Sequence, residues 1–132
     1  MVKLTEPVIR MIRHPDTRKV MATVTPGGRP HVIVCGSLTT TEDDMIVVGD
    51  VYMHRTAENL AGCTAVEFMV WNGRDAYSIV AEARERLTSG PEFDRMANDL
   101  GRMNMDVTAV WLFEPLEVWD ESASRTAGTR VI

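Results

Sequence analysis

Three neighbouring side chains, those of His54, Arg55 and Thr56, could together bind an anion. The guanidinium of Arg55 offers a planar fork of N–H donors, which matches two oxygens of one phosphate or carboxylate. Thr56 adds a hydroxyl, and His54 can donate from a ring nitrogen. The formal net charge of the chain is -5, so the protein as a whole does not attract anions and such a site must act locally. The three residue types together could form a phosphate-binding site.

The flanking segments predict that these residues lie at the start of a helix. The apolar run Met45–Gly49 is typical of a buried strand. The following "TAENLAG" suits a short helix with Thr56 as its N-cap and Gly62 at its end. A helix start leaves backbone N–H groups unpaired and carries about half a positive charge, and both features stabilise a bound phosphate. The alternative from these residues alone is an ordinary capped helix with two exposed basic residues.

Composition indicates one globular domain over residues 1–132, because this length can bury one core but not two. No run approaches the roughly 18 apolar residues of a membrane span, and the N-terminus lacks the apolar centre of a signal peptide. The chain has no basic stripe of the kind that binds nucleic acid. The two cysteines and three histidines are scattered, which argues for a reducing compartment and against a metal site. We therefore expect a cytoplasmic protein with no membrane or nucleic-acid partner.

Most of the remaining chain favours β-structure. The β-rich runs Val20–Val24 and Pro30–Leu38 flank Pro-Gly-Gly and predict a hairpin. Residues 64–71 alternate as a strand and end at the turn sequence "NGRD". Residues 77–87 alternate as well, but their Ala, Glu, Arg and Leu content leaves helix open. The last strand run is Val107–Trp119, in which a proline marks an edge or a bulge.

Two helices are predicted outside this β-rich region. The first begins after Thr5 and is closed by Pro15, and the second covers approximately "PEFDRMANDLG" (91–101). From Asp120 to Ile132 the residues are small and polar, which predicts a mobile tail. About six strands in an order that does not alternate with helices favour a mostly-β fold, an antiparallel β-barrel with peripheral helices.

Three segments, in this order, resemble the FMN-binding split β-barrel superfamily of the pyridoxamine 5'-phosphate oxidases. They are the hairpin "MATVTPGGRPHVIVCGS", the apolar strand "MIVVGD" and the basic–Thr–x–x–Asn segment "MHRTAENL". The chain is most similar to the small, single-domain FMN-binding proteins of that group, which share the Met-His-basic-Thr order and the helix start "GPEF". The similarity covers residues 5–120 and implies a split β-barrel in which residues 77–87 form a strand.

The resemblance implies a homodimer with FMN at its interface and both subunits lining each pocket. Met53–Thr56 would hold the phosphate, while Ala76–Tyr77 and the late strand Val107–Trp119 could reach the flavin of the partner. The cofactor-binding residues that the resemblance implies are His31, Val32, Ile33, Val34, Cys35, Gly36, Ser37, Val48, Gly49, Asp50, Met53, His54, Arg55, Thr56 and Tyr77.

The chain departs from the true pyridoxamine phosphate oxidases in ways that argue against vitamin B6 chemistry. Those enzymes carry more basic residues on the second strand and a substrate-binding C-terminal segment, whereas Val32–Val34 is apolar and the tail lacks that pattern. Many relatives also place an aromatic beside the flavin, where this chain has Cys35–Ser37. Tyr52 or a partner tryptophan could cover the ring instead. Cys35 itself is either a redox thiol or, as we favour, a buried inert residue.

The expected function is therefore that of an FMN-binding flavoprotein, either a small oxidoreductase or an electron carrier, with no catalytic acid or base assigned. Two alternatives keep the same fold and change the cofactor: a deazaflavin-dependent reductase, and a haem-binding or haem-degrading protein in which His31 could be a ligand. A third alternative is a barrel that has no cofactor and serves as an interaction module.

Overall fold

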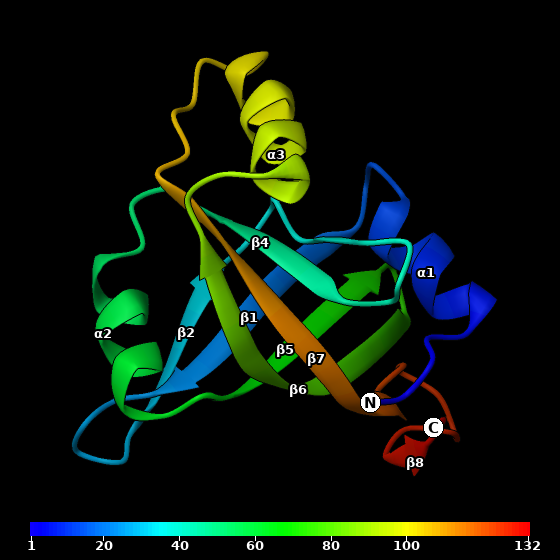
Figure 1. Cartoon of the computed structure of the whole chain (residues 1–132). Coiled ribbons are helices and arrows are strands. Elements are labelled where there is room, and N and C mark those ends of the chain that lie inside the picture. The colour runs from blue at the N-terminus through cyan, green and yellow to red at the C-terminus, as the bar shows by residue number, and fades with distance from the viewer.

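The computed structural model describes all residues, 1–132, and contains three helices and eight strands (Figure 1). In chain order these are α1 (Glu6–Arg13), β1 (Arg18–Val24), β2 (Pro30–Val34), β3 (Thr39–Thr40), β4 (Ile46–Asp50), α2 (His54–Gly62), β5 (Ala65–Asn72), β6 (Asp75–Leu87), α3 (Pro91–Gly101), β7 (Ala109–Asp120) and β8 (Thr129–Arg130). None of the helices has the length and apolar character that a membrane span requires.

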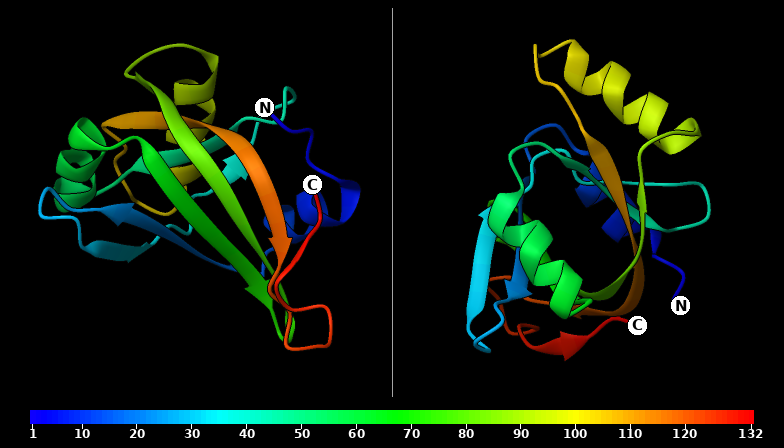
Figure 2. Two further views of the ribbon diagram at one scale, coloured as in Figure 1. Left: turned by 90° about the horizontal axis from the view of Figure 1, so that it is seen from below. Right: turned by 60° about the vertical axis from the view of Figure 1, so that its left-hand side comes forward.

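All eight strands belong to one antiparallel sheet that curls around a core (Figures 1 and 2). The strand order is β2-β1-β5-β6-β7-β4-β3, with β8 added to β7. The edge strands β2 and β3 do not pair with each other, so the barrel stays open on one side. The mostly-β split barrel predicted from the sequence is confirmed. The expected six strands are two too few, because β3 and β8 have only two residues each and leave no periodic pattern.

The core lies inside the curled sheet and is built by alternate residues of its strands. Phe68 of β5 and Phe113 of β7 are fully buried and pack edge to face, with ring centroids 5.0 Å apart. Helix α1 covers one end of the barrel, since the buried Val8 and Ile12 join the same core cluster. Burial at alternate positions is expected for strands that place one face in a core. The packed core therefore fixes the positions of the strands that border the open side of the barrel.

Helix α3 packs on the outer face of the sheet, over β4 and β7 (Figure 2). Its buried Met96 and Leu100 contact Val47 and Val110 in a second, smaller core. A Cβ atom on Gly49 would lie 3.0 Å from both Met96 Cγ and Leu100 Cδ1. The helix therefore approaches β4 closely because this position has no side chain.

Several local predictions are confirmed and two are wrong. Residues 77–87 lie in strand β6, and Pro115 lies at a bulge, since the β6–β7 register shifts between Val80 and Ala81. The strand predicted over Pro30–Leu38 ends at Val34, because the chain then turns and Leu38 N–H donates to the carbonyl of Cys35 at 3.0 Å. The N-cap of α2 is Met53, which makes Thr56 the third residue of the helix instead of its cap.

The C-terminal segment makes more contacts than its composition indicated. Thr129–Arg130 forms β8 against Trp119 and Asp120, and Ile132 packs against the barrel core. The backbone N–H of Val118 also donates to the carbonyl of Ile132 at 3.1 Å. The segment therefore has a defined path along β7, and its mobility in solution stays a prediction.

Candidate functional site

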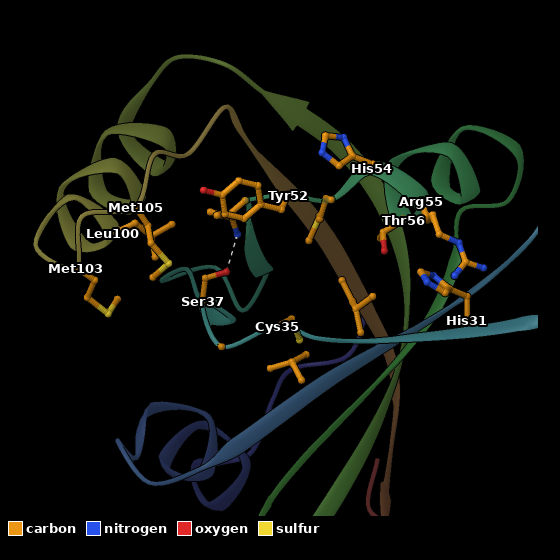
Figure 3. Close-up of a pocket in the computed structure, with 16 residues that line it drawn as sticks. His31, Cys35, Ser37, Tyr52, His54, Arg55, Thr56, Leu100, Met103 and Met105 are labelled. Atoms are coloured by element: carbon orange, nitrogen blue, oxygen red, sulfur yellow. Dashed lines mark hydrogen bonds between the residues drawn. The ribbon is translucent and has the colours of Figure 1, made fainter.

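A pocket of about 670 Å³ opens where β2, β4, α2 and the end of α3 meet (Figure 3). Its volume is within the range usual for sites that bind small molecules, roughly 300–1,000 Å³. The structure brings most of the predicted site residues together in its wall, namely His31, Ile33, Val34, Cys35, Gly36, Ser37, Gly49, Met53, His54, Arg55 and Thr56.

Four of the predicted site residues lie outside this wall. Val32 of β2 is 58% exposed but does not line the pocket, while Val48 is fully buried in the barrel core. Asp50 is buried and its carboxylate accepts a hydrogen bond from the N–H of Met53 at 3.4 Å. Tyr77 lies on β6, beside a separate polar depression next to α1. Within one chain, these four side chains do not contribute to the pocket surface.

Five lining residues were not among the predicted site residues: Val51, Tyr52, Leu100, Met103 and Met105. The apolar face of α3 could be recognised in the sequence, but not its place against β4. Met103 and Met105 follow the helix in a loop whose Asn104 has a positive φ of 56°. Only the packing of α3 brings these two thioethers to the pocket, and no sequence motif marks them.

The α2 end of the pocket carries its polar groups. The first backbone bond of the helix start runs from Ala57 N–H to Met53 C=O at 2.9 Å, so the N–H groups at the start of α2 remain available. Arg55 is exposed and forms no ion pair or side-chain hydrogen bond within the chain. Thr56 is 1% exposed, and its Oγ1 has no hydrogen-bond partner. Buried hydroxyls normally have a hydrogen-bond partner. A bound ligand could supply the partner that Thr56 Oγ1 lacks.

Hydrogen bonds to a buried side chain fix His31 at the same end, where Figure 3 shows its ring close to Arg55. The side-chain amide of Asn59 donates to Thr23 Oγ1 at 2.9 Å and lies 3.2 Å from His31 Nδ1. An amide nitrogen can only donate, so His31 Nδ1 accepts and the ring proton lies on Nε2. Asn59 thereby holds a third donor, the Nε2–H of His31, at the pocket wall beside Arg55 and Thr56.

The turn between β4 and α2 holds a strained residue at the pocket rim. Tyr52 has a φ of 59° and its side chain is 87% exposed. A bulky residue in this left-handed region costs free energy and persists where neighbours hold it. Contacts of Asp50 stabilise this turn. Its carboxylate accepts a hydrogen bond from Met53 N–H and lies 4.0 Å from the guanidinium of Arg86. Its backbone carbonyl accepts a hydrogen bond from Thr108 N–H at 3.2 Å. The aromatic ring thus stands over the pocket mouth in Figure 3.

The rest of the pocket is mainly apolar, with Ile33, Val51, Leu100, Met103 and Met105 in its wall. Cys35 is buried there, and burial raises the pKa of its thiol to about 12, with a smaller opposing effect from Lys19. Cys35 therefore stays protonated at neutral pH and is a poor nucleophile. A pocket with donors at one end and apolar walls elsewhere suits a flat apolar ligand that carries a phosphate.

Comparisons with known proteins agree with this geometry. A family model described as pyridoxamine 5'-phosphate oxidase matches residues 7–122. An FMN-binding protein from Syntrophomonas wolfei subsp. wolfei is similar in structure, with a TM-score of 0.77, 21% identity, and coverage of 89% of this chain and 85% of that chain. HupZ from Group A Streptococcus has a TM-score of 0.78 and 18% identity, with 96% of this chain and 100% of that chain covered.

An F420 reductase has a TM-score of 0.66 and 14% identity, and the match covers 89% of this chain and 98% of that chain. No curated protein matches the chain. At these identities the structural neighbours establish the fold, while the family model extends over most of the sequence. The chain belongs to the pyridoxamine 5'-phosphate oxidase family.

Proposed function

We propose that the protein binds FMN in this pocket and acts as a small oxidoreductase or electron carrier. The observation that carries the proposal is the unpartnered Oγ1 of Thr56, buried beside the free guanidinium of Arg55 at the start of α2. Phosphate oxygens would supply the missing partner, because the unpaired N–H groups and the positive end of the helix dipole both favour an anion there. Membership of the family and the similarity to an FMN-binding protein support the choice of flavin.

The residues present fit this group along its whole length. The donors of Arg55, Thr56 and His31 would hold the phosphate, and the apolar wall from Ile33 to Cys35 would face the ring system. Bound FMN would supply reversible electron transfer, and the protein would bind, orient and shield it. No carboxylate lines the pocket, and we assign no catalytic acid or base to the chain.

We also propose that two copies of the chain form a dimer around this site. Val34, Tyr52 and Met103 line the pocket and are 81%, 87% and 59% exposed, an unusual concentration of apolar surface around one opening. Covering it with a second copy would enclose the flavin and should bury well above the ~1,000 Å² expected of a biological contact. Sedimentation should show a dimer at micromolar concentration, whereas a flavin-loaded monomer would contradict this proposal.

Replacing Thr56 by valine should have opposite effects on stability and on binding. A buried hydroxyl without a partner costs about 1–3 kcal/mol, so the isosteric valine should raise the free energy of unfolding of the apoprotein by about 1 kcal/mol. The same change removes a phosphate contact and should weaken FMN binding about fivefold. Denaturant unfolding and FMN titration measure the two effects.

Thr23→Val is the matched control. The hydroxyl of Thr23 is also buried but, unlike that of Thr56, accepts a hydrogen bond from the side-chain amide of Asn59. That variant should lose stability because one N–H of the buried Asn59 amide loses its acceptor. Equal losses of stability in the two variants would show that Thr56 has a partner that the pocket does not provide.

The visible absorption spectrum of the purified protein tests the choice of cofactor. Two bands at the flavin positions are expected, and the released cofactor should be FMN. A single blue-shifted band would identify a deazaflavin, in keeping with the similarity to an F420 reductase. A Soret band would identify haem. Either of the last two results, or a colourless protein that gains no flavin bands with added FMN, would overturn the proposal.

A further inference from the structure

A second cavity, of about 330 Å³, adjoins the cofactor pocket at the end away from α2. The two cavities share four wall residues, Gly36, Ser37, Leu100 and Met103. In Figure 3 three of these, Ser37, Leu100 and Met103, lie on one side of the pocket, while Arg55, Thr56 and His31 lie on the other. A ligand in the second cavity would therefore meet the cofactor at the end opposite its phosphate.

Cationic groups dominate the wall of the second cavity. The two cations are Arg13 and Lys19, and the one carboxylate in the wall, that of Asp99, already pairs with Arg102 at 3.3 Å. The guanidinium of Arg13 donates to Thr40 Oγ1 at 3.2 Å. The Nδ1 atom of His14 accepts a hydrogen bond from the backbone N–H of Asp16 at 3.1 Å and lies 3.4 Å from the side-chain nitrogen of Asn72. The net charge facing this cavity is positive.

Lys19 is the residue whose state points to a ligand. Its ammonium is half-buried, donates one hydrogen bond to the carbonyl of Leu38 at 2.8 Å, and has no carboxylate within ion-pair distance. Burial lowers the pKa of Lys19, an effect that a smaller interaction with Cys35 opposes. Because the ammonium has already lost part of its hydration on folding, an anion would bind it more strongly than it binds an exposed lysine.

Gly36 and Ser37 lie where the two cavities meet. A Cβ atom on Gly36 would have no neighbour within 4 Å, so the backbone borders free space that both cavities share. Next to it, the hydroxyl oxygen of Ser37 accepts the N–H of Gly49 at 2.9 Å. The hydroxyl hydrogen of Ser37 is left free to donate toward a ligand at this junction.

We propose that the second cavity binds the acidic group of an organic anion, whose flat apolar body extends over Gly36 and Ser37 into the cofactor pocket. Lys19 and Arg13 would bind the carboxylate or sulfonate, and Leu100 and Met103 would contact the body. The inference rests on the proposed function in one respect: the anion is a substrate only if FMN is bound in the neighbouring pocket. The substrate would then be an organic acid that reaches the ring end of the flavin. The acidic group itself needs only the second cavity.

Calorimetric titration with two matched probes tests the proposal on the FMN-loaded protein. Naphthalene-2-sulfonate carries the charge, and naphthalene-2-sulfonamide has nearly the same shape without it. The sulfonate should bind about ten- to a hundredfold more tightly, as expected for charge-assisted hydrogen bonds. It should also change the absorption spectrum of the bound flavin, because its rings would lie against the cofactor.

Two lysine variants form the matched comparison, because Lys3 and Lys19 are the two lysines of the chain. Lys19→Met should remove most of the preference for the sulfonate, whereas Lys3→Met removes the same charge from an exposed position and should leave the preference intact. Equal binding of the two probes to the wild type, or equal affinity of both lysine variants for the sulfonate, would overturn the proposal.

Failure of the proposed function can be told apart from failure of this inference. If the protein does not bind FMN, the titrations are made on the Arg55→Ala apoprotein, in which the phosphate end has lost its cationic side chain and attracts the sulfonate less. A preference for the sulfonate that persists there, and disappears when Lys19→Met is added, supports the anion cavity by itself. Loss of the preference in Arg55→Ala alone would place the anion at the start of α2 and overturn the inference.

Discussion

Replacing Arg55 by alanine is expected to weaken FMN binding ten- to a hundredfold and to leave riboflavin binding almost unchanged. The side chain lines the α2 end of the pocket and has no partner within the chain, so its donors are available for the phosphate. A charge-assisted hydrogen bond is worth about 1.5–3 kcal/mol, and about 1.4 kcal/mol corresponds to a tenfold change in affinity. Riboflavin has the same ring and ribityl chain but no phosphate. Fluorescence titration of the apoprotein with each flavin measures both affinities.

Thermal unfolding of the apoprotein is the control for Arg55→Ala. Since the guanidinium is exposed and unpaired, its removal should leave the melting temperature unchanged. Arg29→Ala, at an exposed arginine in the β1–β2 turn, removes the same charge outside the pocket and should not affect the binding of either flavin. Equal losses for FMN and riboflavin in Arg55→Ala would place the phosphate elsewhere.

The largest expected effect on stability comes from Phe68→Ala, which should lower the free energy of unfolding by about 3–5 kcal/mol. Phe68 is fully buried at the centre of the barrel and packs edge to face against Phe113. Truncation removes buried apolar surface and leaves a cavity, in a protein whose total stability should be about 5–15 kcal/mol. Urea unfolding followed by tryptophan fluorescence measures the loss.

Phe93→Ala is the matched control, because Phe93 of α3 is only partly buried against the smaller core. Its loss should cost clearly less than that of Phe68. A similar cost for both variants would show that the outer packing of α3 contributes as much to stability as the barrel interior does, contrary to the burial that the structure assigns to them.

The sequence was sufficient to predict the longer strands of the sheet because their apolar and polar residues alternate. The alternation in residues 64–71, the turn after Val24 and the proline of the last strand each have a local physical cause, and each lies where the pattern predicted it. Residues 77–87 could not be settled locally, because Ala, Glu and Arg suit both helix and strand. Pairing with both β5 and β7 decides the strand, and such long-range contacts have no local signature.

The candidate site was predictable where it lies on consecutive residues and unpredictable where it depends on packing. The segment "MHRTAENL" reaches the pocket as expected, but an error of three residues in the position of the N-cap hid the unpartnered hydroxyl of Thr56. Met103 and Met105 arrive only because α3 lies against β4. Gly49 lines the pocket as predicted, but its missing side chain also accommodates Met96 and Leu100, which the sequence did not reveal. No single segment could reveal the cation-lined second cavity, which joins α1, β1 and α3.

The most direct test of the account compares FMN with riboflavin on the wild-type apoprotein under identical conditions. FMN should bind at least about a hundredfold more tightly than riboflavin. The guanidinium of Arg55, the hydroxyl of Thr56 and the free N–H groups of α2 would all donate hydrogen bonds to the phosphate. The preference should shrink as the salt concentration rises, because the Arg55 site is exposed. Equal affinity for the two flavins, or no binding of either, would contradict the claim that the α2 end of the pocket, with Arg55 and Thr56, holds the phosphate of FMN.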